Sequence, residues 1–219
     1  MGVINYPLVQ GEVETIAAVA SGLNLGRCGD GEAKIACGQG YSREPGGDKI
    51  AEEMRAFIRT PNEGCIVGIP QINDDSPKLD TWLRNAGRFM RLVDPLSTYY
   101  SAFVSRPDSA PWIRTQAFLE SVHALWRGKL AIVVCERKGS MHAAVRMTAA
   151  KARHIECPTH EAYSVIDDLE REIATARPQI AVLSAGPTAT LLANRLAKHQ
   201  IHAIDMGSAG KFLMEYEGC

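Results

Sequence analysis

The amino-acid sequence predicts an α/β protein with a Rossmann-like, mostly parallel sheet and helices on both faces. Short apolar runs of strand length alternate with segments in which apolar residues recur at helical spacing, most regularly in the second half of the chain. This alternation favours a parallel sheet, because a parallel connection needs a crossover long enough to hold a helix. No internal repeat or low-complexity segment interrupts the pattern. We therefore expect a single domain over residues 1–219.

In the first half of the chain, the spacing of apolar residues predicts helices over residues 12–21, 47–59 and 78–93. Two short apolar runs, Leu23–Arg27 and Cys65–Ile69, are predicted strands. Three arginines fall on a different face of the third helix from its apolar residues, and they form either a solvated surface or a contact with an anionic acceptor or a partner subunit. These arginines are Arg84, Arg88 and Arg91.

The second half of the chain contains four apolar runs of strand length, separated by helical patterns over residues 162–176 and 191–197. The predicted strands are Leu130–Cys135, His154–Cys157, Ile180–Ser184 and His202–Asp205. In an open parallel sheet, ligands bind beyond the carboxyl ends of the strands. The polar residues and glycine expected at that edge are Asp30, Glu32, Glu136, Gly186 and Asp205.

A glycine-rich acidic turn follows the first of these strands, in the stretch Leu25-Gly26-Arg27-Cys28-Gly29-Asp30-Gly31-Glu32-Ala33. Asp30 and Glu32 are two residues apart and would point to the same side of an extended backbone. Gly29 and Gly31 allow a tight turn and a close approach to a ligand. Carboxylate oxygens suit Mg²⁺ or Mn²⁺, which complete their coordination with water and substrate phosphates. The alternative is an ordinary connection between a strand and a helix.

A second turn, Ser184-Ala185-Gly186-Pro187-Thr188, ends a predicted strand in glycine and begins a helix with proline. Proline suits the first helical position because its missing N–H costs nothing there. The amides exposed in the first turn of a helix can bind phosphate oxygens. A plain strand-to-helix junction is the competing interpretation.

These stretches together resemble the GT-D-type glycosyltransferases, a family formerly described as a domain of unknown function. The acidic turn from Arg27 to Glu32 is similar to the family's Asp-x-Glu signature, and Ala181–Ala189 is similar to its Gly-Pro-Thr-Ala turn. Between them, Phe103–Pro107 resembles its central Ser-Arg-Pro segment. The resemblance implies a metal-dependent transferase that moves a sugar from a nucleotide-sugar donor, expected to be a UDP-sugar, to an acceptor hydroxyl. A glycan or glycoprotein acceptor is favoured, and a hydroxymethylated DNA base is the alternative.

The resemblance, together with the positions of single residues in the sequence, suggests individual roles. Asp30 and Glu32 are expected to hold Mn²⁺ or Mg²⁺ as catalytic carboxylates. Glu136 and Asp205 are candidates for the catalytic base, because a carboxylate can accept the acceptor's proton. Glu136 could instead pair with Lys138, and Asp205 could instead cap a turn. The residues expected to bind the nucleotide sugar are Arg27, Gly29, Gly31, Arg106, Gly186, Pro187, Thr188, Ser208 and Lys211.

Two of these positions carry alternatives. Arg106 could neutralise a phosphate with its fork of donors or could form a surface ion pair. Ser208 stands where family members carry a histidine after the Asp-x-Gly of the terminal strand. A serine can donate a hydrogen bond to phosphate, but it cannot take up a proton near neutral pH. Lys211 is close enough in sequence to supply the missing positive charge, or it is only solvated.

The composition is that of an ordinary globular enzyme, with 46% hydrophobic and 22% charged residues. The net charge of −1 gives no general attraction to polyanions, which argues against DNA. Six cysteines form no C-x-x-C pair, the N-terminus lacks a signal-peptide pattern, and no run of 18 apolar residues occurs. We therefore expect a cytoplasmic enzyme without a membrane span, and a homo-oligomer is compatible with the sequence.

Two other functions use the same residues. A metal-dependent phosphohydrolase acting on a nucleotide or sugar phosphate would employ the paired carboxylates with water as acceptor. A noncatalytic nucleotide-binding module would bind the ligand without turnover. The chain has neither a G-x-x-x-x-G-K-[ST] loop nor a G-x-G-x-x-G turn, which argues against a P-loop kinase and a nicotinamide dehydrogenase.

Overall fold

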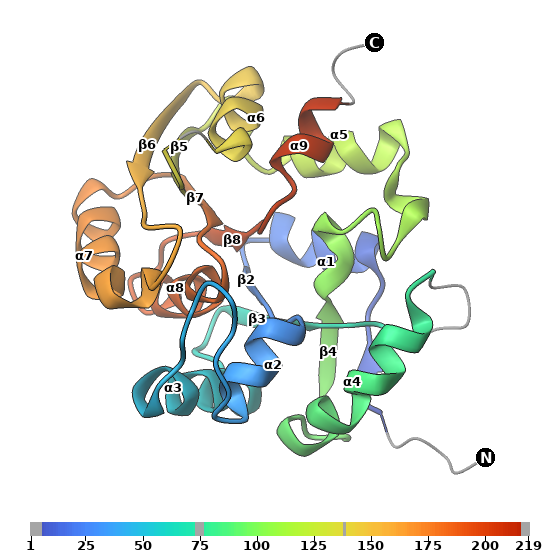
Figure 1. The fold of residues 1–219 in the computed structure, drawn as a ribbon. Coiled ribbons are helices and arrows are strands. Elements are labelled where there is room, and N and C mark those ends of the chain that lie inside the picture. The colour runs from blue at the N-terminus through green and yellow to red at the C-terminus, as the bar shows by residue number, and fades with distance from the viewer. Residues whose placement is uncertain (1–5, 73–76, 138, 216–219) are drawn as a thin grey trace.

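The computed structural model describes residues 6–72, 77–137 and 139–215, and it contains one parallel sheet in this part of the chain. The strand order is β1-β4-β3-β2-β8-β7-β5-β6 (Figure 1). The strands are β1 (Leu8–Val9), β2 (Asn24–Arg27), β3 (Cys65–Ile69), β4 (Thr98–Ser101), β5 (Leu130–Cys135), β6 (Lys151–Glu156), β7 (Ile180–Ser184) and β8 (Ala203–Asp205). Every pairing between them is parallel, which confirms the predicted fold class.

Helices cover both faces of this sheet (Figure 1). The α-helices are α1 (Glu12–Ala20), α2 (Asp30–Ala36), α3 (Asp48–Arg59), α4 (Leu79–Leu92), α5 (Gln116–Ala124), α6 (Ser140–Thr148), α7 (Ile166–Ala176), α8 (Pro187–Ala197) and α9 (Gly210–Glu215). The described residues also form three short 3-10 helices, η1 (Ala102–Ser105), η2 (Pro111–Ile113) and η3 (Ala162–Val165).

The side chains of the buried strands divide between two hydrophobic clusters, as the two-residue repeat of a strand requires. In β5, Ile132 and Val134 belong to the cluster that includes α2, α3, α7 and α8. Ala131 and Val133 belong to the other cluster, with α1, α5, α6 and α9. A strand that is buried on both faces reads as a continuous apolar run, which is why the sequence identified β5 and β7 with their observed bounds.

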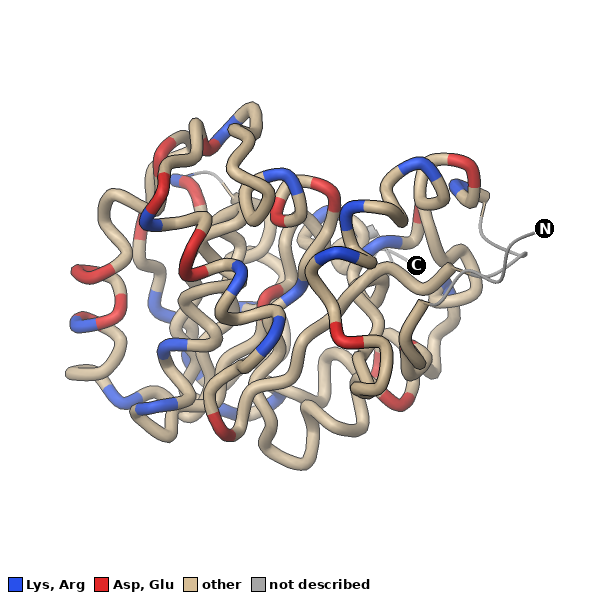
Figure 2. The backbone as a smooth tube through the Cα atoms, turned by 90° about the horizontal axis from the view of Figure 1, so that it is seen from below, with Lys and Arg blue, Asp and Glu red and all other residues tan. Residues whose placement is uncertain are grey.

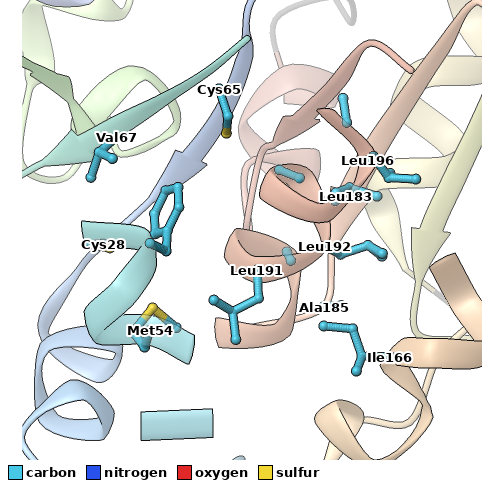
Figure 3. Close-up of a cluster of buried hydrophobic side chains, with 14 of the residues drawn as sticks. Cys28, Met54, Cys65, Val67, Ile166, Leu183, Ala185, Leu191, Leu192 and Leu196 are labelled. Carbon is cyan, nitrogen blue, oxygen red and sulfur yellow. The ribbon is translucent and has the colours of Figure 1, made fainter. Parts of the chain in front are cut away.

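Helix α8 lies in the middle of the first cluster. Leu191, Leu192 and Leu196 are fully buried, and Figure 3 shows them with Leu183 of β7 and Met54 of α3. Burying a leucine side chain contributes about 1.5 to 3 kcal/mol. These three side chains therefore fix α8 firmly against the sheet, and with it the turn that precedes the helix.

A glycine lets α8 lie close to β2. A Cβ atom at Gly26 would be 2.6 Å from Cζ of Phe57 and 2.8 Å from the carbonyl oxygen of Thr190. The Thr190 hydroxyl in turn donates to the carbonyl of Arg27 at 2.7 Å. The absence of a side chain at Gly26 thus brings the end of β2 beside the start of α8.

The sequence did not reveal β1, which is an edge strand, or β4, which lies between β1 and β3. Strand β1 has two residues, and β4 is Thr-Tyr-Tyr-Ser, so neither reads as an apolar run. At the opposite edge, β6 begins at Lys151 and not at His154, because its first three residues, at a sheet edge, are not buried. Apolar runs mark buried strands and fail at sheet edges, where half of the side chains meet water.

Positive and negative residues are interspersed along the chain, in keeping with the net charge of −1 (Figure 2). Among the described residues, no helix combines the length and the apolar character that crossing a membrane requires.

Candidate active site

A cavity of about 630 Å³ lies at the carboxyl ends of the central strands. Its lining includes residues that follow β2, β5, β7 and β8, which is the edge where the sequence predicted a ligand site. Twelve of the thirteen predicted site residues line it, and Thr188 does not. The twelve are Arg27, Gly29, Asp30, Gly31, Glu32, Arg106, Glu136, Gly186, Pro187, Asp205, Ser208 and Lys211.

The two carboxylates of the acidic turn lie in the first turn of α2, where Asp30 is the first and Glu32 the third helical residue. The expectation of an extended backbone is therefore wrong, because successive helical residues turn by about 100° and residues two apart do not share a face. Both side chains still reach the cavity. Glu32 folds back towards the helix start, where its Oε2 accepts a hydrogen bond from the Gly29 amide at 2.8 Å.

The environments of these two carboxylates differ. The side chain of Asp30 is 41% exposed and its Oδ2 lies 3.6 Å from Nζ of Lys34. Burial, together with the negative charge of Asp205, raises the pKa of Glu32 to about 7. Ionised Glu32 is thus a poorly solvated negative charge facing the cavity.

Arg27, at the end of β2, is held in place by β8 and η1. Its Nε donates to the carbonyl of Asp205 at 2.6 Å and its Nη2 donates to Oδ1 of the same residue at 3.0 Å. Its Nη1 donates to the carbonyl of Ala102 at 3.1 Å and to Oγ of Ser105. Every guanidinium nitrogen therefore has an acceptor, and the group is a positioned positive charge in the cavity wall.

Asp205 is buried, and both of its oxygens are engaged. Oδ1 accepts from Arg27 and from the amide of Gly207, and Oδ2 accepts from the Arg27 amide and the Thr190 hydroxyl. Gly207 has a φ of +49°, and a Cβ there would lie 2.2 Å from Nη2 of Arg27. Asp205 both caps the turn after β8 and fixes the arginine.

Arg106 lines the cavity and also forms an ion pair, so the two expectations for it are compatible. Its Nε and Nη2 donate to the two oxygens of Asp108, each at 2.9 Å. This pairing holds the pKa of Asp108 well below its usual range. Lys78 bonds to the same carboxylate, so Arg106 presents its charge from a fixed position.

The turn before α8 has the backbone of a glycine turn. Gly186 precedes the helix with φ +57° and ψ −145°, and a Cβ there would meet nothing within 4 Å. Glycine is needed for the dihedral angles and not for space. Pro187 is the first helical residue, as predicted. Thr188 follows in the first turn of the helix, and its side chain is fully buried and does not line the cavity.

Glu136 follows β5 and is exposed in the cavity, whereas Lys138, its expected partner, lies outside the described residues. Ser140 begins α6 at the same edge of the sheet and lines the cavity too. Ser140 was not among the site residues predicted from the sequence, although its position after an apolar strand could have indicated it.

Five further residues of the cavity lining were not among the predicted site residues. Tyr41, Arg43 and Glu44 lie between α2 and α3 and line one side of the cavity, while Trp82 and Phe103 line another. The rings of Trp82 and Phe103 are in contact, with centroids 5.1 Å apart. No motif marks Tyr41, Arg43 or Glu44, so only the folded chain brings these three residues to the site.

The parallel sheet, covered by helices on both faces, and the cavity lined by acidic and basic residues at its carboxyl edge define an α/β protein with a candidate ligand site at that edge. The family model for the glycosyltransferase GT-D fold matches residues 25–218. This chain therefore belongs to the GT-D glycosyltransferases, as the three sequence motifs had implied.

Individual relatives agree with this assignment. The chain is 25% identical over 198 residues to the glycosyltransferase GlyD of Streptococcus pneumoniae serotype 4 (strain ATCC BAA-334 / TIGR4), covering 84% of this chain and 24% of that protein. It thus spans about a quarter of the length of this relative.

Solved structures share the fold. One, described as a highly conserved domain of unknown function 1792 with a distinct glycosyltransferase fold, has a TM-score of 0.86 and 22% identity, covering 98% of this chain and 83% of its own. Another, described as a new glycosyltransferase from Streptococcus sanguinis, has a TM-score of 0.81 and 17% identity. The match covers 96% of this chain and 85% of the solved chain.

Proposed function

We propose that this chain transfers a sugar from a nucleotide-sugar donor, expected to be a UDP-sugar, to an acceptor hydroxyl, with Mn²⁺ or Mg²⁺ held by Asp30 and Glu32. One observation carries the proposal. The acidic start of α2 and the glycine turn before α8, which are far apart in the sequence, line the same cavity beside the positioned guanidinium of Arg27.

The side chains fit a divalent ion. Both candidate ligands are carboxylates, which hard cations prefer. Burial and the negative charge of Asp205 raise the pKa of Glu32, and a bound divalent ion would oppose this shift by stabilising the ionised form. No group of three His, Cys, Asp or Glu residues that could hold a metal occurs in the described chain. Two carboxylates leave coordination positions for water and phosphate, and the bound ion would neutralise the diphosphate charge as the nucleotide leaves.

The chain's own residues would bind the rest of the diphosphate. Arg27 offers a positive charge whose position is set by Asp205 and Ser105, so little ordering is needed on binding. Lys211 adds a second positive charge to the cavity. The N-terminus of α8, which is the positive end of the helix dipole, also faces the cavity. Arg106 and Ser208 line the same cavity as further donors.

We assign Asp205 a positioning role through Arg27, because its two oxygens already accept four hydrogen bonds. Glu136 is then the better candidate for a base, since it is exposed in the cavity. An inverting reaction would need it to take the proton from the acceptor hydroxyl. Positioning of donor and acceptor would supply most of the remaining rate enhancement.

Calorimetry of UDP binding tests this assignment. UDP should bind in the presence of Mn²⁺ and lose its affinity in EDTA, because the two carboxylates repel an unscreened diphosphate. Asp30→Asn and Glu32→Gln should each remove the metal-dependent binding, whereas Glu120→Gln, an exposed carboxylate on α5, should bind as the wild type does. Equal affinity with and without the ion would refute the metal bridge.

A mass-spectrometric screen of nucleotide sugars with manganese identifies the donor and the product. Transfer of a sugar mass to an acceptor supports the proposal. Free sugar or free phosphate as the main product would indicate a phosphohydrolase, and binding without turnover would indicate a nucleotide-binding module.

For the acceptor we propose a glycan or glycoprotein, and the net charge of −1 argues against the alternative of a hydroxymethylated DNA base. A cytoplasmic location and pairing with a second copy of the chain belong to the same proposal. Sedimentation of the purified chain tests the pairing with a second copy, since a single species with the mass of one chain would exclude a stable homo-oligomer.

A further inference from the structure

A hairpin between α2 and α3 places a carboxylate in the cavity that none of the sequence motifs includes. The amides and carbonyls of Tyr41 and Glu44 bond to each other at 2.7 and 2.9 Å. The carbonyl of Arg43 accepts from the Glu161 amide at 2.8 Å, which ties the hairpin to the segment before η3. The backbone of Glu44 is therefore held from two sides.

The Glu44 side chain is buried and sparsely hydrogen-bonded. The residue is 5% exposed, yet it lines the cavity. Within the described residues, its one hydrogen-bond donor is the amide of Tyr163, 3.2 Å from Oε2, and no lysine or arginine forms an ion pair with it. A carboxylate can accept about four hydrogen bonds. Among the described residues, most of the accepting capacity of Glu44 is thus unused.

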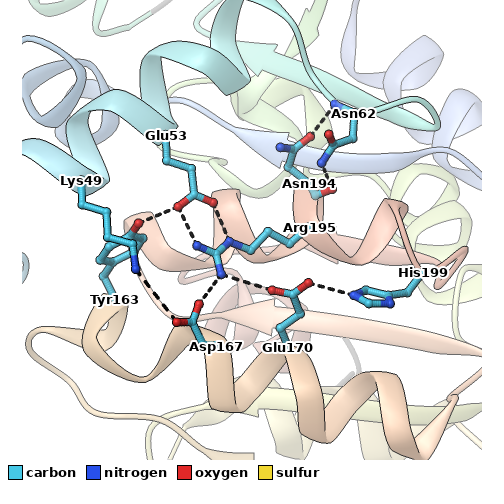
Figure 4. A network of polar contacts seen from close by, with 9 residues as sticks. All are labelled: Lys49, Glu53, Asn62, Tyr163, Asp167, Glu170, Asn194, Arg195 and His199. Atoms are coloured by element: carbon cyan, nitrogen blue, oxygen red, sulfur yellow. Dashed lines mark hydrogen bonds and ion pairs between the residues drawn. The ribbon is translucent and has the colours of Figure 1, made fainter.

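Tyr163, which supplies that single donor, is itself anchored on the far side. Its hydroxyl donates to Oε2 of Glu53 at 2.6 Å, and Arg195 donates to both oxygens of Glu53, at 2.5 and 2.7 Å (Figure 4). This network joins η3, α3 and α8. Glu44 consequently rests against a fixed support, as a residue that recognises a ligand must.

The chemistry of the site restricts what can bind Glu44. It does not belong to a metal-binding group with Asp30 and Glu32, since the described chain has no set of three such residues placed to hold an ion. A negatively charged phosphate would be repelled. Neutral hydroxyl groups are donors that satisfy a carboxylate without adding charge, and both the ribose and the hexose of a nucleotide sugar carry pairs of them.

We propose that Glu44 recognises a hydroxyl pair of the donor, on the ribose or on the transferred sugar, and so makes the cavity selective for donors that keep those hydroxyls. This inference rests on the proposed function of the same cavity. Burial raises the pKa of Glu44, in keeping with a carboxylate that lacks donors in the free protein.

The test compares Glu44→Gln with the wild type by calorimetry in Mn²⁺, using UDP, 2′-deoxy-UDP and the UDP-hexose that the wild type consumes. Glutamine keeps the shape and one accepting oxygen, so the Tyr163 contact survives, while the charge is lost. We expect affinity for the UDP-hexose to fall about tenfold or more, the scale for hydrogen bonds to a charged group.

The ligands separate the two sources of hydroxyls. Recognition of the ribose predicts that Glu44→Gln weakens UDP and the UDP-hexose equally and has a smaller effect on 2′-deoxy-UDP, which keeps only the 3′-hydroxyl of the pair. Recognition of the sugar predicts that only the UDP-hexose is weakened. Glu161→Gln is the matched control, because Glu161 is exposed, lies beside the hairpin and does not line the cavity. Thermal unfolding confirms that each variant is folded.

The inference is overturned if Glu44→Gln binds UDP and the UDP-hexose as tightly as the wild type does, or if Glu161→Gln weakens them equally. Either result leaves the proposed function intact. Failure of the wild type itself to bind UDP or any nucleotide sugar would overturn both together.

Discussion

Replacing Glu32 by glutamine should stabilise the folded chain at alkaline pH while removing metal-dependent donor binding. Glu32 has an ordinary pKa of 4.5 that the fold raises to about 7. Between these two values the folded state binds more protons than the unfolded state, so the raised pKa makes stability fall as the pH rises through that window. Glutamine mimics the neutral form of the side chain at every pH.

The magnitude follows from the two pKa values. Their difference corresponds to about 3 kcal/mol once the pH is above both, to about 1.4 kcal/mol at pH 5.5 and to almost nothing at pH 4. The glutamine oxygen can still accept the bond from the Gly29 amide that caps α2. The loss of a charge near the helix N-terminus costs about 0.3 to 1 kcal/mol and reduces the gain slightly.

Urea unfolding followed by circular dichroism, in EDTA at pH 5, 6.5 and 8, measures the effect. The free energy of unfolding of Glu32→Gln should exceed that of the wild type by about 2 to 3 kcal/mol at pH 8, and the difference should shrink as the pH falls. Asp30→Asn is the matched control. The side chain of Asp30 is 41% exposed and pairs with Lys34, so its replacement should change stability by less than about 1 kcal/mol. A destabilised Glu32→Gln at pH 8, or a difference that does not vary with pH, would refute this account of the carboxylate.

Three further substitutions test the other parts of the site. Gly186→Ala should lower the free energy of unfolding in urea by about 1 to 3 kcal/mol, because φ is +57° there, and unchanged stability would contradict the strain argument. Asp205→Asn should weaken donor binding in calorimetry about tenfold, since the Arg27 guanidinium loses its charged partner; wild-type affinity would show that Asp205 does not position it. Ser208→Ala should cost about 1 to 2 kcal/mol of donor affinity and leave the pH profile of turnover unchanged. Loss of all turnover at saturating donor would give Ser208 a larger role than hydrogen bonding.

Local patterns in the sequence were sufficient for the fold class and for most of the buried elements. Strands β5 and β7 were identified because both of their faces are apolar, and α3 was identified from its helical stripe and the proline that follows it. The turn at Gly186 and Pro187 was also recognised from local sequence, since glycine permits backbone angles that other residues avoid and proline fixes φ. These features depend on neighbours in the sequence.

The arrangement of the site depended on residues that are distant in the sequence. The identity of Arg27 gives no hint that Asp205 and Ser105 would use its nitrogens, and Thr188 of the second motif turned into the core. Glu44 has no motif at all, and it reaches the cavity because its hairpin is tied to η3.

The sequence by itself determined the parallel α/β architecture, the acidic residues at the end of one strand and the glycine turn at the end of another, because periodicity and turn chemistry are local. Only the tertiary structure decided that Asp30 and Glu32 begin a helix and that Glu32 is the carboxylate with the raised pKa. Solvation and electrostatic potential are summed over every group nearby in space. The ionisation of Glu32 therefore depends on Asp205, a residue brought beside it only when β2 and β8 pair.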